Sequence, residues 1–245
     1  MRIAKKIAES GAASRREAER LIAEGRVRVN GEVVTTPVFF VDDSHEITHE
    51  ITIDGKPIGR KSEKLVVWKM NKPKGYITTK RDPKGRKTVF DLFPETNDRL
   101  LYIGRLDYNS EGLLLFTNDG NFSRKLELPA TGLTRSYKVR FHGNLSKEKI
   151  EKLKNGVTID GINYGPIDVK ITKQDKSNNW AILTLREGKN REIRKVLESL
   201  DCIVNRLIRI SYGTVSLGPL PSGKIEKLSE NEVRKLVKAA DKSEI

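Results

Sequence analysis

Residues 104–116 read Gly-Arg-Leu-Asp-Tyr-Asn-Ser-Glu-Gly-Leu-Leu-Leu-Phe, and this stretch sets the expected fold of the chain around it. It joins the apolar run Leu101–Leu106 to a second apolar run, Leu113–Thr117, through a polar turn. Short apolar runs bounded by turn residues indicate buried strands. Asp107 therefore stands at the end of a strand, where a carboxylate can project into a cleft. On spacing alone, the simpler interpretation is that Asp107 caps the turn.

The same alternation of short apolar runs and amphipathic segments continues over residues 64–245. Helices are expected over Ser146–Asn155, over 193–200 and after Ser229, where Glu232 completes a capping box. Strands outnumber helices, so we predict a sheet-rich α+β domain with a mixed or antiparallel sheet. Its remaining strands are expected at Leu65–Met70, Ser136–Phe141, 167–171 and Trp180–Leu185.

Residues 1–48 predict a separate small module of two helices and a hairpin. A first helix starts at Ile3, and a second starts at Ser14. Valines flank Asn30-Gly31, which is the strongest short signal for a β-hairpin. We expect residues 49–63 to form the last strand of this module and a linker.

The charge of the chain indicates an anionic partner. The 245 residues carry a formal net charge of +14, and residues 1–60 hold ten basic and ten acidic residues. All of the excess therefore lies beyond residue 60. Such a charge is typical of proteins that bind nucleic acid, although it also serves solubility alone.

The composition excludes several other classes of protein. No run of about 18 apolar residues occurs, so a membrane-spanning helix is not expected. The only cysteine, Cys202, cannot form an internal disulfide, which is typical of the cytoplasm. His45, His49 and His142 lack the spacing of a zinc site, and no phosphate-binding loop is present. We therefore expect a cytoplasmic protein with no metal and no cofactor, and a monomer.

Five separate motifs resemble the bacterial pseudouridine synthases of ribosomal RNA, in the family that holds synthase A for the small subunit and synthase B for the large one. Gly-Arg-Leu-Asp at 104–107, followed by Ser110 and Gly112-Leu113, is similar to the active-site signature of this family. Further similar segments are 72–76, 136–139, 188–194 and 206–215. In addition, residues 14–31 resemble the RNA-binding module named after ribosomal protein S4.

The resemblance implies a role for each matching residue. Asp107 becomes the catalytic carboxylate, Tyr137 lies against the target base, and Arg194 forms an ion pair with Asp107. Arg105 fills the space that the uridine leaves when it flips out of the RNA helix. The remaining residues expected to bind RNA are Lys72, Lys74, Lys189, Arg191, Arg15, Arg16 and Arg20. Taken singly, each of these cations is more simply explained as a solvated charge.

The implied reaction detaches uracil from ribose and rejoins it through ring carbon 5. Asp107 can attack the base, attack the anomeric carbon or abstract a proton from the sugar, and the sequence leaves all three open. Segments 112–120 and 188–194 resemble the large-subunit type more closely, so we expect large-subunit ribosomal RNA, or a ribosomal particle during assembly, as the substrate. The alternatives are small-subunit RNA with the same chemistry, and a non-catalytic assembly factor. A glycoside hydrolase would need a second carboxylate near Asp107.

Overall fold

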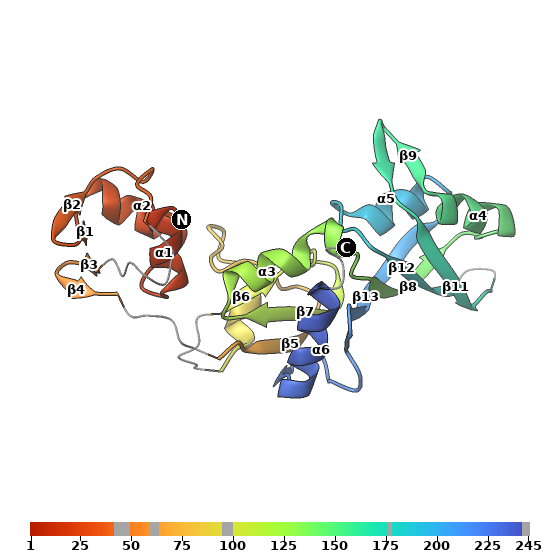
Figure 1. The fold of residues 1–245 in the computed structure, drawn as a ribbon. Coiled ribbons are helices and arrows are strands. Elements are labelled where there is room, and N and C mark those ends of the chain that lie inside the picture. Colours follow the sequence, from red (N-terminus) through yellow and green to blue (C-terminus); the bar gives the residue numbers. More distant parts are fainter. Residues whose placement is uncertain (42–49, 59–63, 95–99, 176–177, 242–245) are drawn as a thin grey trace. The chain divides into compact units, whose positions relative to one another are not determined.

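A computed structural model describes residues 1–41, 50–58, 64–94, 100–175 and 178–241 (Figure 1). The chain divides into two compact units, Met1–Lys64 and Leu65–Ile245. Within the described ranges, no helix is both long enough and apolar enough to cross a membrane.

The first unit packs two helices on a small antiparallel sheet. Its elements are α1 (Ile3–Glu9), α2 (Arg15–Ala23), β1 (Val27–Val29), β2 (Glu32–Val34), β3 (Ile51–Ile53) and β4 (Lys56–Pro57). The strand order is β2-β1-β3-β4. Residues 49–63 thus contain two short strands where the sequence predicts one. Ser14 caps α2 as predicted, since its side chain accepts from the backbone N–H of Glu17 at 3.2 Å.

The predicted hairpin at Asn30-Gly31 is confirmed. Val29 pairs with Glu32, and the two turn residues have φ values of 50° and 87°. Positive φ at both central positions belongs to a two-residue hairpin turn, and Asn-Gly is the pair that adopts it most readily. The buried side chains of α1, α2 and β1 enclose the core of this unit.

The second unit is built on one nine-stranded mixed sheet. The main path runs β11-β12-β8-β13-β7-β5-β15, with β14 beside β13 and β6 beside β7. The neighbours β13 and β7 run parallel, and the other pairs are antiparallel. The strands are β5 (Val67–Lys72), β6 (Leu101–Ile103), β7 (Glu111–Thr117), β8 (Arg135–His142), β11 (Ile167–Lys173), β12 (Asn179–Leu185), β13 (Ile203–Tyr212), β14 (Val215–Ser216) and β15 (Ile225–Lys227).

Helices cover both faces of this sheet and enclose two apolar clusters. One cluster includes side chains of α4 (Lys147–Asn155) and α5 (Glu192–Glu198), and the other includes those of α3 (Gly120–Glu127) and α6 (Glu230–Asp241). A two-stranded hairpin of β9 (Val157–Ile159) and β10 (Ile162–Tyr164) follows α4, and short 3-10 helices span Val89–Leu92 and Pro129–Thr131. The predicted α+β class with a mixed sheet is confirmed.

Candidate active site

The turn between β6 and β7 carries Asp107. The backbone N–H of Ser110 donates to the carbonyl of Asp107 at 3.0 Å and closes the turn. The hydroxyl of Thr78 fastens the turn to a neighbouring loop by donating to the carbonyl of Leu106 at 2.9 Å. The side chain of Asp107 remains 36% exposed, so its carboxylate is open to a substrate.

Lys72, the last residue of β5, supports this turn from inside the protein. Its side chain is fully buried. The ammonium group donates to three backbone carbonyl oxygens, of Pro73 at 3.2 Å, Asp107 at 3.1 Å and Ser110 at 2.9 Å. Burial lowers the pKa of Lys72 to about 8, although Asp107 and Glu111 act in the opposite direction. The charge of Lys72 is therefore used within the fold, and its side chain has no exposed surface from which to reach the RNA backbone as expected.

Two arginines at the start of α5 lie near the Asp107 turn, and their arrangement differs from the prediction. Arg191 forms an ion pair with the carboxylate, since its Nη1 lies 3.9 Å from Oδ2 of Asp107. Arg194 donates to the carbonyl of Val204 at 2.9 Å and to that of Asn109 at 3.4 Å. Burial and the charge of Arg191 lower the pKa of Arg194, and Asp107 opposes this shift. Among the described residues the predicted ion pair of Arg194 with Asp107 is absent, and Arg194 instead fastens the turn through its backbone.

The loop before α5 carries a further cation, Lys189. Lys189 forms an ion pair with Glu187, and its ammonium lies 5.8 Å from the ring centroid of Tyr164. Arg191 is 49% exposed. Of these two predicted RNA-binding residues, Arg191 faces Asp107, whereas Lys189 is held by a carboxylate.

Tyr137 lies in β8 and is only 9% exposed. Its ring belongs to the same apolar cluster as Leu106, next to Asp107, and Ile193 of α5. Tyr137 is therefore held in the sheet within the same apolar cluster as the residue that precedes Asp107.

Lys74, in the loop after β5, and Arg105, in the segment after β6, are both exposed. The backbone N–H of Gly75 donates to the carbonyl of Tyr108 at 3.0 Å, which ties the loop after β5 to the turn. Both cations are thus open to contact with phosphates near Asp107.

The cations predicted on α2 are exposed, but they are not equivalent. Arg20 donates to Glu17 at 3.0 Å and forms an ion pair with Glu24. Arg15 forms a longer ion pair, of 3.5 Å, within the same helix. No ion pair of Arg16 with another described residue is present. Arg16 is therefore the one of the three whose charge is least compensated.

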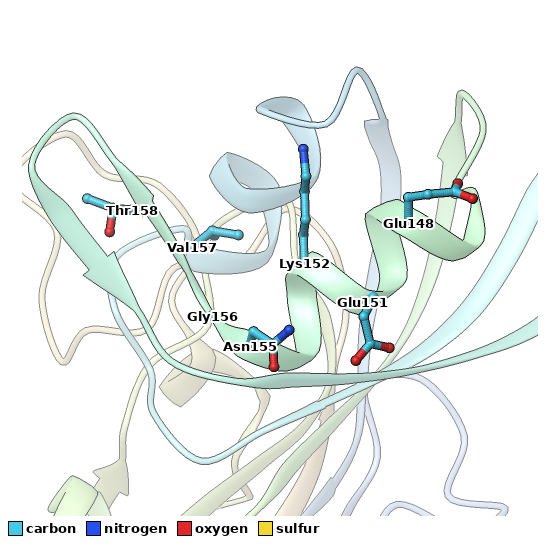
Figure 2. Close-up of a pocket in the computed structure, with 7 residues that line it drawn as sticks. All are labelled: Glu148, Glu151, Lys152, Asn155, Gly156, Val157 and Thr158. Carbon is cyan, nitrogen blue, oxygen red and sulfur yellow. The ribbon is translucent and has the colours of Figure 1, made fainter.

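A hollow in this unit lies away from Asp107. In the described ranges, no group of three His, Cys, Asp or Glu side chains lies close enough to hold a metal ion. A shallow hollow of about 670 Å³ lies beside α4, where Glu148, Glu151 and Lys152 line it together with residues 155–158 (Figure 2). None of these residues belongs to the loops around Asp107.

Two protein-family profiles match the sequence of this chain. The sequence profile described as RNA pseudouridylate synthase matches residues 66–199, and that of the S4 domain matches residues 1–47. The chain belongs to the RNA pseudouridine synthase family. The synthase is therefore an isomerase with an RNA substrate, and the Asp107 turn and the loop before α5 lie within the matched segment.

Relatives of the synthase match it over almost its whole length. An uncharacterized RNA pseudouridine synthase of Rickettsia felis is 44% identical over 234 residues, covering 96% of this chain and 99% of the relative. Ribosomal large subunit pseudouridine synthase B of Bacillus subtilis is 38% identical over 242 residues, covering 98% and 97%. A crystal structure of a pseudouridylate synthase superposes with a TM-score of 0.67 at 26% identity and covers 96% of this chain and 99% of its own.

Sequence reasoning missed two features of the synthase site. The burial of Lys72, which lets it support the turn, could have been predicted from the sequence. Lys72 lies two residues after Met70, so both side chains share one face of β5, and Met70 is a core residue. No signal in the sequence predicts that Arg191 lies close to Asp107, because this proximity depends on a left-handed backbone conformation (φ 51°) at Arg191.

Proposed function

We propose that the synthase converts a specific uridine of large-subunit ribosomal RNA into pseudouridine, with Asp107 as its catalytic carboxylate. The observation that carries this proposal is the similarity to large-subunit synthase B of Bacillus subtilis over 98% of the chain. The position of Asp107 adds support, because its carboxylate is partly exposed among basic loops.

The proposed reaction breaks the bond between N1 of uracil and C1′ of ribose and forms a bond between C5 and C1′. The proton on C5 is released, and N1 takes up a proton, so atoms and charge balance. Asp107 stabilises the electron-poor sugar or bonds to it covalently, as carboxylates do in glycoside chemistry. The guanidinium of Arg191 lies beside this carboxylate, with its Nη1 3.9 Å from Oδ2 of Asp107.

We further propose that the uridine flips out of its helix to reach Asp107. Exposed Arg105 occupies the vacated space, which offsets an unstacking cost of a few kcal/mol. Tyr137 stacks against the flipped base, a contact worth about 1–3 kcal/mol. Its hydroxyl can accept or return the proton that moves from C5.

The RNA is held by exposed cations outside the reacting centre. Lys74 beside the Asp107 turn and Arg16 on α2 are exposed for phosphate contact. Arg15 and Arg20 contribute where RNA phosphates displace their glutamate partners. We infer that the synthase acts as a monomer in the cytoplasm; gel filtration and cell fractionation test these two points.

Pseudouridine mapping of total RNA tests the proposal. Cells lacking the gene receive either the wild-type gene or the Asp107→Asn variant. We expect one large-subunit uridine to lose its modification and only the wild type to restore it. Loss of a small-subunit site would refute the proposed target, and restoration by Asp107→Asn would refute the catalytic role of Asp107. If no site changes and Asp107→Asn rescues ribosome assembly, the chain is an assembly factor instead.

A further inference from the structure

Two carboxyl side chains, Glu187 and Glu192, fasten the loop that connects β12 to α5. The backbone N–H of Lys189 donates to Oε2 of Glu192 at 2.9 Å. The backbone N–H of Gly165 donates to Oε1 of Glu187 at 2.6 Å, and the ammonium of Lys189 pairs with the other oxygen of Glu187. The loop is therefore tied to the start of α5 on one side and to the connection between β10 and β11 on the other.

This loop places Arg191 next to the catalytic turn in an unfavourable backbone conformation. Arg191 has φ 51° and ψ 29°, and its Nη1 lies 3.9 Å from Oδ2 of Asp107. A left-handed conformation at a residue other than glycine is strained and persists only where surrounding contacts impose it. The contacts adjacent to Arg191 are those of Glu192, the next residue, with Lys189.

The two carboxyl groups cannot both be charged at low cost. Glu192 is 4% exposed, and its Oε1 is enclosed without a hydrogen-bond partner in the described part of the chain. Burial and the adjacent carboxylate of Glu187 raise the pKa of Glu192 to about 8. Burial also acts to raise the pKa of Glu187, but hydrogen bonds from Lys189 and Gly165 outweigh it and lower the pKa. Glu192, whose Oε1 is enclosed without a partner, therefore keeps a proton more readily than Glu187, which accepts from Gly165 and pairs with Lys189.

The other charged groups near the loop are cations. Besides Lys189, Arg135 lies beside it and donates to the carbonyl of Arg186 at 2.7 Å. Tyr164 lies beneath the ammonium of Lys189.

We propose that Glu187 and Glu192 share one proton and that this acid–carboxylate pair is the positioning device that keeps Arg191 beside Asp107. When Glu192 loses the proton, two adjacent carboxylates repel each other, the loop loosens and Arg191 leaves its position. Glu187 and Glu192 act through Arg191 and do not touch the substrate. The inference rests on the proposed role of Asp107.

The pH dependence of the reaction rate tests this inference with the full-length protein and unmodified large-subunit RNA. The variants are Glu192→Gln, which keeps a donor without a titrating proton, and Glu192→Leu, which keeps neither contact. Glu198→Gln is the matched control, because Glu198 is an exposed glutamate on the same helix. One pH unit above the pKa leaves about a tenth of the groups protonated, so we expect the wild-type rate to fall by up to about tenfold between pH 7 and 9 relative to Glu192→Gln.

Glu192→Leu should be slower than wild type at both pH values, and Glu198→Gln should follow the wild-type profile. Superimposable profiles of wild type and Glu192→Gln would overturn the inference, and so would full activity of Glu192→Leu at pH 7. If thermal unfolding shows that Glu192→Leu is not folded, the pH profiles of wild type and Glu192→Gln still test the inference. Asp107→Asn separates the two proposals: an active variant refutes the role of Asp107, whereas an inactive variant with coincident profiles refutes only the shared proton.

Discussion

Replacing Lys72 by methionine tests whether this buried charge serves the fold or the RNA. The substitution keeps an unbranched side chain and removes the donor to three carbonyl oxygens, at 3.2, 3.1 and 2.9 Å. Each hydrogen bond to a charged group contributes about 1.5–3 kcal/mol, and removing a buried ammonium recovers part of its desolvation cost. We expect a net loss of about 2–4 kcal/mol in the free energy of unfolding. Because a domain of this size shifts by about 2–4 °C per kcal/mol, Tm should fall by roughly 4–16 °C.

The Lys72→Met variant should lose catalytic activity and keep its affinity for RNA. The Asp107 turn loses its internal support, so kcat should fall more than about tenfold, since misplacing a catalytic group by 1 Å costs up to about a hundredfold. RNA affinity and its salt dependence should stay near wild type, because Lys72 is fully buried. Lys74→Met is the matched control: it should keep Tm and kcat, weaken binding and reduce the salt slope by about one charge. A Lys72→Met variant with wild-type Tm and a reduced salt slope would refute the reasoning.

Three further predictions concern Gly112, the titration of Lys72, and the arginines of α2. A Cβ on Gly112, where φ is 98°, would lie 2.3 Å from the carbonyl oxygen of Arg209, so Gly112→Ala should lower stability by more than about 3 kcal/mol in denaturant unfolding; wild-type stability would contradict this. Since the pKa of Lys72 is lowered from 10.5 to about 8, the unfolded state binds more protons between these values. The free energy of unfolding should therefore rise with pH across this window, by up to about 1.4 kcal/mol per unit, and Lys72→Met should lack this rise. Arg16→Ala should weaken RNA binding more than Arg20→Ala, because Arg20 is paired with carboxylates; equal losses in a filter-binding titration would disprove the distinction.

Local signals in the sequence predicted most elements of the fold. Ser146 caps α4 by accepting from Lys149 at 3.4 Å, and Ser229 and Glu232 form the predicted reciprocal contacts before α6. These signals succeed because a cap or a tight turn depends on residues within three positions of each other. Asp119 shows the limit of such reasoning: it caps α3 by accepting from Asn121 and Phe122, but Asp-Gly after a strand is equally typical of a plain turn.

Pairing between distant strands is not visible in the sequence. β13 lies parallel to β7, with Ile208 opposite Glu111, and this pairing brings α5 and its loop towards the Asp107 turn. Periodicity shows that each strand is buried, but it does not identify the neighbour of a strand. Motif matching therefore proposed Asp107, Tyr137 and Arg194 and paired Arg194 with Asp107, whereas Arg191 is the arginine that lies 3.9 Å from the carboxylate.

The net charge of +14 overstates the surface available to RNA, because several cations are internal. Arg209 is 2% exposed and donates to the carbonyl of Leu113 at 2.6 Å. Arg135 is 5% exposed and donates to Tyr212 and to the carbonyl of Leu133. Together with Lys72, these residues satisfy backbone carbonyls in the sheet and its turns, where an uncharged donor would bond more weakly. Only exposed cations release counterions on binding, so the salt slope of RNA binding should report the exposed charge and not the total.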